Sequence, residues 1–339
     1  MNRLEKYIIH NLSMLFLSIF SALFAIASII FLIKLATYTA VIQLSIWDMT
    51  KLYIFVIPEL LFFTLPITFF VSAALTIFRL SNDNEIVVLF ALGIHPKFIL
   101  KTLLKPALLL SALLLFNFFV LFPHTKVMSK NFISFKKSEA KFNLAASEFG
   151  HKFGDWLLYL GEKNSDDTYS NVFLFNKKGN EEILIESDRA KIINDSGILR
   201  LKLIDGEGYS YSKEKFSQVN FENMLINDTF DSELTEYKTA IDYWQSDERR
   251  SKKDYMLITD TLLSIFPVVG LFLVLSISIV HARHQKSKIY LFLFIGLLTY
   301  YGSAIGLQKF FAFYTIPIVA LTWLIITYII YKKTVVARF

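Results

Sequence analysis

The sequence contains no cysteine, and only 19% of its 339 residues are charged. The missing cysteines exclude a disulfide framework, a zinc site with thiolate ligands and a lipid anchor on a cysteine. No Gly-x-x-x-x-Gly-Lys-Ser/Thr loop occurs in the chain, so it does not bind a nucleotide by that route. Apolar residues make up 54% of the chain, and 34 of them are phenylalanine. A soluble domain of this length has more charge, so the composition predicts a polytopic α-helical membrane protein.

Six apolar runs are long enough to cross a bilayer as helices. A hydrocarbon core of ~30 Å needs roughly 20 helical residues at about 1.5 Å each. Ala25-Ile26-Ala27 resembles a signal-peptide cleavage site, but the first apolar run continues past it, which predicts an uncleaved span. The predicted transmembrane helices are residues 8–35, 52–78, 98–122, 256–280, 289–307 and 313–331.

A polar insert, residues 123–255, separates the third span from the fourth. It holds 20 Lys and Arg and 23 Asp and Glu, whereas the rest of the chain holds 15 and 6. Turn signals at 178–180, 195–197 and 205–206 divide short runs with the pattern of strands. These runs are residues 156–160, 171–175, 182–186, 199–203 and 215–221. We therefore predict an inserted all-β domain that is a small sandwich or jelly-roll-like.

The short loops predict the orientation of the chain in the membrane. Twelve Lys and Arg residues lie near the span ends on one side, and three on the other. The side rich in Lys and Arg is the cytosolic one. Both termini are thus expected in the cytosol, and the β domain is expected to face outward on the opposite side of the membrane. The domains expected are residues 1–122, with three spans, then 123–255, with the β domain and its linkers, and 256–339, with three spans and a cytosolic tail.

A polar break at residues 79–97 lies between the second and third spans. Residues 81–83 are Ser, Asn and Asp, each of which can cap a helix N-terminus, and Gly93 and Pro96 are stop signals. Irregular backbone cannot be exposed to lipid, so the break has to lie in water. We predict a short amphipathic helix at about 81–94 on the cytosolic face, with an apolar surface that suits docking of another protein.

The residues of this break resemble the cytosolic coupling segment of the lipopolysaccharide export permeases, the LptF/LptG family. The matching residues are Arg79-Leu80, Asn84-Glu85 and Ala91-x-Gly93-Ile94, with Asn84 where the family has a small Ser.

Two further stretches fit the same family. Leu201 to Gly206 followed by Tyr209 is similar to its Leu-x-Asn-Gly-x-x-Tyr pattern, with Asp205 in place of Asn. Arg3-x-x-x-Tyr7-Ile8 fits its opening. The layout of three spans, an outward β domain and three spans agrees over the whole length.

The resemblance implies a permease subunit of an ABC-type exporter that extracts lipopolysaccharide from the inner membrane and passes it to a periplasmic bridge. The partners implied are a paralogous permease, forming an LptF with LptG heterodimer, a cytosolic ATPase dimer resembling LptB, and bridge proteins resembling LptC and LptA. The chain itself is then not an enzyme, needs no cofactor and binds no nucleic acid.

The resemblance also implies roles for single residues. Residues of the ATPase-coupling contact are Arg79, Glu85, Leu89 and Gly93. Glu85 has a second explanation, since an acidic residue at a helix N-terminus stabilises the helix dipole. The phosphates of the lipid are expected to bind Lys34, Lys51 and Lys309, although a lysine near a span end can also extend its ammonium group to the interface.

Other functions remain open at this point. The chain could be the membrane subunit of another ABC-type lipid or lipoprotein release system, an integral-membrane enzyme that modifies a glycolipid, or a structural scaffold. His281 and His284 lie three residues apart but in a basic loop, so no metal site is predicted.

Overall fold

The computed structural model describes residues 3–39, 44–142, 151–153, 156–164, 168–178, 181–195, 198–212, 215–227, 239–247, 250–279 and 288–337. The chain forms two compact units. The helical unit comprises residues 1–37, 49–126 and 237–339, and the β unit comprises residues 38–48 and 127–236.

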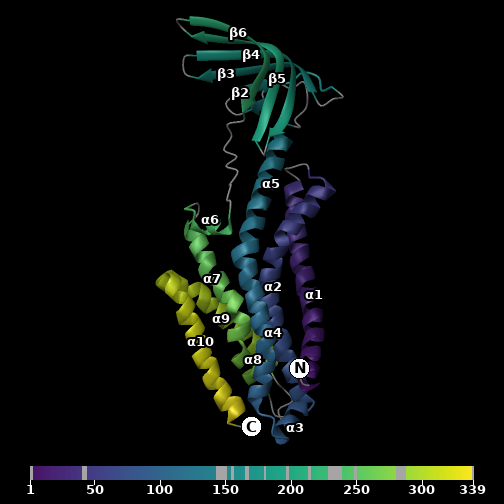
Figure 1. Ribbon diagram of the computed structural model, residues 1–339, viewed down its shortest axis with the longest axis vertical. Helices are drawn as coiled ribbons and strands as arrows, with labels where there is room; N and C mark the ends of the chain where they lie inside the picture. The colour runs from purple at the N-terminus through teal and green to yellow at the C-terminus, as the bar shows by residue number, and fades with distance from the viewer. Residues whose placement is uncertain are drawn as a thin grey trace. The chain divides into compact units, whose positions relative to one another are not determined.

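The predicted apolar runs form helices throughout the described residues (Figure 1). Helix η1 is a π-helical turn that joins α4 to α5 without a break, so this helix continues past Pro123 to Phe142. The helices are α1 (Arg3–Thr39), α2 (Ile46–Asn82), α3 (Glu85–Ala91), α4 (Pro96–Phe116), η1 (Asn117–Leu121), α5 (Phe122–Phe142), α6 (Ala240–Gln245), α7 (Arg250–Val269), α8 (Leu271–Ser278), α9 (Ile289–Phe311), η3 (Ala312–Tyr314), α10 (Thr315–Tyr331) and η4 (Lys332–Val336).

Several helices have the length and composition of membrane spans. Four stretches among the described residues qualify, or five if α7 and α8, which meet at a bend of 46°, are counted as one span. One of the four, residues 289–336, contains a reversal at Ala312, whose φ is 45°. The rings of Tyr300 and Trp323 lie 5.1 Å apart across it, whereas 23 residues of straight helix extend about 35 Å. Helices α9 and α10 therefore form a hairpin.

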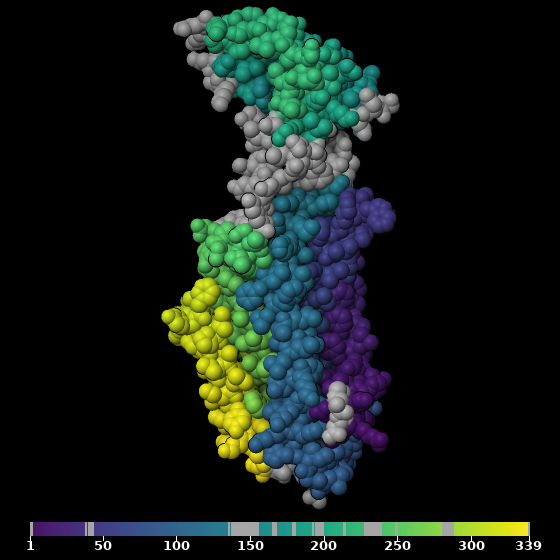
Figure 2. Space-filling view, in the orientation of Figure 1, coloured from purple at the N-terminus to yellow at the C-terminus, as the bar shows by residue number. Residues whose placement is uncertain are grey.

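The core of the helical unit lies between α2, α4 and α7, with α8 to α10 against it. Small residues allow close approach of the helices, because lipid-embedded helices associate by packing and not by burial from water. Ala73 and Ala107 are fully buried, and a Cβ atom on Gly296 would lie 2.8 Å from Leu273 Cδ2. Figure 2 shows α1 and α10 at the flanks of this unit, where apolar side chains such as Leu17 and Ile325 are exposed.

The β unit contains one antiparallel sheet in which each strand pairs with its sequence neighbours, in the order β1 to β6. The strands are β1 (His151–Phe153), β2 (Trp156–Tyr159), β3 (Thr168–Lys178), β4 (Glu181–Asp195), β5 (Ile198–Ser212) and β6 (Lys215–Asn227). All five predicted strand runs are confirmed. The predicted jelly roll is not, because that fold pairs strands distant in sequence and the described strands form a meander.

A line of residues interrupts the pairing of β3 to β6 at one level, and we call it the break line. It consists of Asn171, Asp188, Asp205 and Glu222, which are exposed and lack partners in an otherwise continuous register. Asn171 and Asp205 have left-handed backbone, with φ of 50° and 53°. The turn predicted at 205–206 is therefore wrong: Asp205 adopts turn-like backbone, but β5 continues through it.

The break line shifts the alternation of buried residues by one position. In β4, Ile185 and Ser187 are buried on one side of it and Ala190 on the other. Because all four strands shift at the same level, the register is kept and one face stays apolar along the whole sheet. The Ser187 hydroxyl stabilises the break: it accepts from the Ile204 amide at 3.1 Å and donates to the Arg189 carbonyl at 2.8 Å.

Gly206 is required where the strands approach most closely. A Cβ atom there would lie 2.2 Å from the Glu186 carbonyl oxygen, whereas on Gly208 its nearest neighbour would be 3.8 Å away. We predict that Gly206→Ala destabilises the β unit by about 1 to 3 kcal/mol, as overpacking does. Gly208→Ala on the same strand is the control and should have little effect. Thermal unfolding monitored by far-ultraviolet circular dichroism measures both, and equal shifts would contradict the account.

Candidate functional site

The predicted coupling segment, residues 79–97, contains a helix shorter than expected. Helix α2 extends to Asn82, so residues 81–83 do not cap the next helix as predicted. Ser81 is fully buried within the last turn of α2, where sequence signals favoured a helix start. Helix α3 begins after Asn84, whose φ is 63° and whose side chain makes no capping hydrogen bond.

The Ala91-x-Gly93-Ile94 motif forms the C-terminal stop of α3. The Gly93 amide donates to the Phe90 carbonyl and the Ile94 amide to the Leu89 carbonyl, each at 3.0 Å. This pair of bonds is a Schellman motif, which needs a left-handed residue after the helix. Gly93 has a φ of 83° and provides it. Gly93 thus has a structural reason to be where it is, beside its expected part in coupling.

Helix α3 has an inner and an outer face. Ile86 is 1% exposed and packs into the core of the helical unit, with Phe90 beside it. Val88 and Leu92 point outward and are 55% and 75% exposed. Leu89 lies between the faces and is half-buried. Sequence reasoning named Leu89 and missed Val88 and Leu92, although their i, i+4 spacing opposite Ile86 and Phe90 would have identified them.

Polar contacts fasten this segment to neighbouring helices. The Tyr7 hydroxyl of α1 donates to Glu85 Oε1 at 3.0 Å. Lys105 of α4 pairs with Glu5 of α1 at 3.0 Å. Arg79 is only 4.0 Å from Asp83 in an exposed i, i+4 pair, which contributes little stability. The start of α1 is therefore tied to both α3 and α4.

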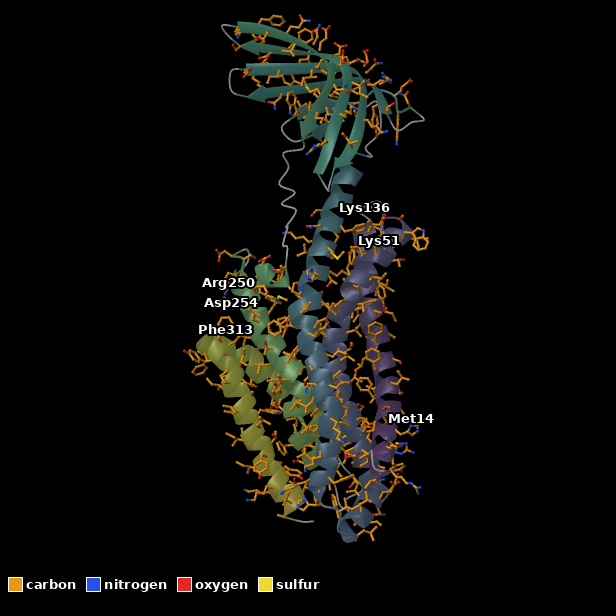
Figure 3. All side chains as sticks on the ribbon, in the orientation of Figure 1. Met14, Lys51, Lys136, Arg250, Asp254 and Phe313 are labelled. Atoms are coloured by element: carbon orange, nitrogen blue, oxygen red, sulfur yellow. The ribbon has the colours of Figure 1, made fainter. Side chains whose placement is uncertain are left out.

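The three lysines expected to bind lipid phosphate do not gather at one place. Lys34 is exposed near the end of α1, and Lys51 is exposed near the start of α2. These helices contact each other there, because the Ser28 and Tyr53 hydroxyls lie 2.9 Å apart. Lys309 lies in the last turn of α9, and Phe313 follows that helix in η3. Figure 3 shows Lys51 and Phe313 on opposite sides of the helical unit.

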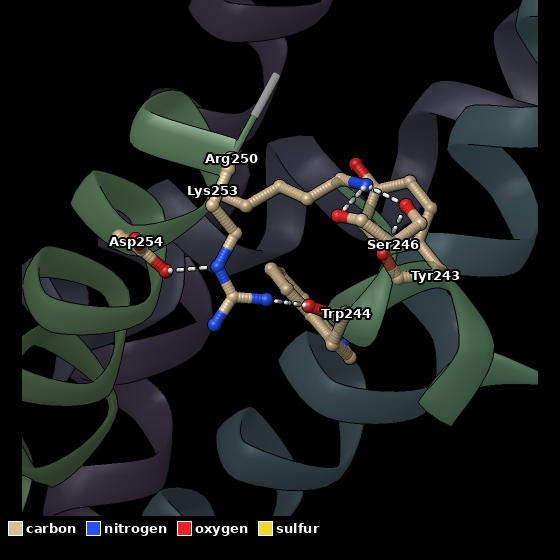
Figure 4. A network of polar contacts seen from close by, with 6 residues as sticks. All are labelled: Tyr243, Trp244, Ser246, Arg250, Lys253 and Asp254. Carbon is tan, nitrogen blue, oxygen red and sulfur yellow. Dashed lines mark hydrogen bonds and ion pairs between the residues drawn. The ribbon is translucent and has the colours of Figure 1, made fainter. Parts of the chain in front are cut away.

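A polar network surrounds the point where the chain re-enters the helical unit (Figure 4). Lys253 is 5% exposed, and its ammonium group lies 4.7 Å from the centre of the Tyr243 ring and bonds to Ser246. Arg250 donates to the Trp244 carbonyl at 3.1 Å. Arg250 also forms an ion pair with Asp254, in which Nε of Arg250 lies 3.2 Å from Asp254 Oδ1.

Trp244 joins α6 to the π-helical turn of the third span. Its indole N–H donates to the Phe119 carbonyl at 3.2 Å, and its ring lies 4.9 Å from that of Phe118. Pro123 has no N–H to donate to the carbonyl four residues before it, which is that of Phe119. Trp244 therefore satisfies a carbonyl that the proline leaves without its helical partner.

Comparison with known protein families identifies the chain. A family model described as the lipopolysaccharide export system permease LptF/LptG matches residues 6–331. The chain belongs to this family. A comparison with curated proteins gave no significant match. The expected family is confirmed, and with it a transporter permease of the inner membrane rather than an enzyme.

The permease also contains a buried ionisable group that sequence reasoning did not single out. Asp260 in α7 is 9% exposed, and Oδ1 lies 3.2 Å from the Thr259 hydroxyl. Glu59 of α2 is part-exposed and pairs with Lys126 of α5 at 3.2 Å. The signal for Asp260 was a lone acid in an apolar run, which in a membrane helix faces the protein interior.

No metal centre is formed by the described residues. Among them, no group of three or more His, Cys, Asp or Glu side chains could hold an ion. His281 and His284, the pair considered from the sequence, lie outside the described residues.

The two faces of α3 should respond differently to truncation. We predict that Ile86→Ala lowers stability by about 2 to 5 kcal/mol, because it leaves a cavity in the core. Val88→Ala, on the exposed face, should leave the unfolding midpoint nearly unchanged. Thermal unfolding of the two variants in the same detergent tests this, and a Val88→Ala shift as large as that of Ile86→Ala would refute the assignment of faces.

Proposed function

We propose that this permease extracts lipopolysaccharide from the inner membrane and passes it to a periplasmic bridge, driven by a separate ATPase. The observation on which this rests is the family match over residues 6–331, joined to a coupling segment with a fastened inner face and an exposed apolar outer face. The paralogous permease subunit would complete a heterodimer, LptF with LptG.

The proposal includes six membrane crossings, with both termini in the cytosol and the β unit in the periplasm. The helices available for them are α1, α2, the continuous α4–η1–α5, the bent pair α7–α8, α9 and α10. The hairpin of α9 and α10 supports counting them separately. The excess of Lys and Arg in the short loops of one side supports the orientation.

The exposed face of α3 is the proposed docking surface for the ATPase dimer, with Arg79, Glu85, Leu89 and Gly93 at the contact. Val88 and Leu92 would supply apolar area at its centre. Force on α3 would be transmitted to α1 through Tyr7 and Glu85. The pair of Lys105 with Glu5 would extend it to α4.

Lys34, Lys51 and Lys309 are proposed to bind phosphate groups of the glycolipid. Lys51 and the end of α9 lie on opposite sides of the unit. A single lipid could therefore contact both kinds of position only if the paralogous subunit contributes one of them. The apolar side chains exposed on α1 and α10 could be covered by such a partner subunit or by lipid.

The proposed bridge proteins, resembling LptC and LptA, would extend the sheet at an edge strand. Among the described strands, the edges are β1, with three residues, and β6, with thirteen. The longer edge offers more backbone hydrogen bonds, so β6 is the proposed docking edge.

Glu85→Ala is predicted to leave the permease folded but to weaken ATPase binding about tenfold, which corresponds to ~1.4 kcal/mol. Glu59→Ala is the control: it removes a part-exposed, paired acidic side chain from a different helix, α2, and should leave ATPase binding unchanged. Co-purification and ATP-dependent release of lipopolysaccharide measure both. Unchanged binding and release in Glu85→Ala would remove Glu85 from the coupling contact.

The β6 edge can be tested by cross-linking, because the chain has no native cysteine to interfere. A cysteine at Val219, which is 58% exposed on β6, should cross-link to a bridge protein that has a cysteine in its own edge strand. A cysteine at Lys152 of β1 is the control and should not. Cross-links from Lys152 alone would assign the bridge to the other edge.

A further inference from the structure

The break line divides the sheet into two halves, and the half that contains Ala190 and Leu203 has one apolar face packed in the core of the β unit. Ala190 of β4 and Leu203 of β5 are paired partners, and both are 0% exposed. Successive side chains of a strand point to opposite faces. The residues that alternate with Ala190 and Leu203 therefore point away from the core, and this outer face is the one considered below.

Four cationic residues lie together on that outer face, and we call them the basic patch: Arg189, Lys191, Arg200 and Lys202. The first two alternate along β4 and the last two along β5. Lys191 is directly opposite Lys202 in the register, and Arg200 is opposite the next outward position of β4. Neighbouring strands lie ~4.8 Å apart, and alternate residues about 6.8 Å apart, so the patch presents four cations within one small area.

Such an arrangement costs stability unless anions neutralise it. Like charges directly opposite each other on a sheet face are destabilising. Arg189 has an exposed ion pair with Asp205 of the break line, 3.5 Å away. Within the described part of the chain, the ammonium groups of Lys191 and Lys202 have no ion pair or hydrogen bond. Two opposed cations are thus left without a partner among the described residues.

On the other side of the break line, the same outer face is acidic. It also has a pair of opposed like charges, but one member of that pair accepts hydrogen bonds from neighbouring side chains. Glu186 is directly opposite Glu207. Glu207 accepts hydrogen bonds from the Tyr209 hydroxyl and from Gln218, and the bond raises the pKa of Tyr209. Charge is therefore segregated along the face, and an anion would be drawn to the basic half and repelled from the other.

We propose that the basic patch binds the phosphate groups of a phosphorylated saccharide, the headgroup of the glycolipid that the permease exports. This rests on the proposed function for the identity of the ligand. Arg189 and Arg200 suit bidentate contacts with phosphate oxygens, and Lys191 and Lys202 act as point charges between them. A saccharide with more than one phosphate matches a patch of several cations better than a single phosphate does.

The test is a titration of the full chain in detergent micelles with a soluble, bis-phosphorylated glucosamine disaccharide that has no acyl chains. Isothermal titration calorimetry gives the affinity. We expect the double variant Lys191→Gln/Lys202→Gln to bind about tenfold more weakly. The control Lys177→Gln/Lys215→Gln removes two other lysines of the same sheet and should bind within about twofold of the original chain. The unfolding midpoint should not fall in the patch variant, because opposed lysines do not stabilise the sheet.

Three results would overturn the proposal. They are an affinity unchanged in the patch variant, an equal loss in the control variant, or equal binding of glycerol phosphate, which would make the source an ordinary phospholipid headgroup. The probe has no acyl chain and the assay has no ATPase, so its outcome does not depend on transport. Failure of export by the assembled complex would instead refute the proposed function.

Discussion

A backbone carbonyl within an apolar helical unit has to find a donor in the chain itself, and this constraint governs how the permease is joined together. In a lipid environment, an unsatisfied polar group costs several kcal/mol, so partners have to come from neighbouring helices. The Tyr300 hydroxyl donates to the Leu262 carbonyl, and Asn117 donates to that of Pro58. Trp244 donates to the Phe119 carbonyl, which Pro123 leaves without a helical donor. Each of these bonds joins two helices that are far apart in sequence.

The last of these bonds is important because of where it lies. The third span leads along the chain into the β unit, and α6 follows the segment that leads back from it. The bond from Trp244 to Phe119 therefore fixes the outgoing and returning segments to each other within the helical unit. Lys253 and Arg250 then hold α6 on the start of α7. If the third span moved relative to α7, either these contacts would break or α6 would move with the span.

Much of the fold could be predicted from the sequence, since apolar runs and alternation reflect burial directly. The strands and the helices were found for that reason. The ends of the helices were not predicted, because they depend on tertiary contacts. Helix α2 continues through Ser81, a good capping residue that is buried here, and a π-helical turn precedes Pro123, through which α5 continues. The Asp205-Gly206 pair looked like a turn, since a left-handed residue before glycine occurs both in turns and within an interrupted strand. In the candidate site, the motif around Gly93 was recognised, but the outward pair of Val88 and Leu92 needed the orientation of α3.

The two units differ in how their cationic side chains are accommodated, because their surroundings differ. In the helical unit, the buried ammonium group of Lys253 would face apolar surroundings without a partner, and it bonds to Ser246. In the β unit, water can solvate an ammonium group, so Lys191 and Lys202 can remain opposed at a modest cost. The break line makes this possible without disturbing the core, because the shift at one level keeps the same face apolar while the outer face changes from acidic to basic. A sheet that only had to be stable would not need this division of charge, which points to a role for the outer face in contact with an anion.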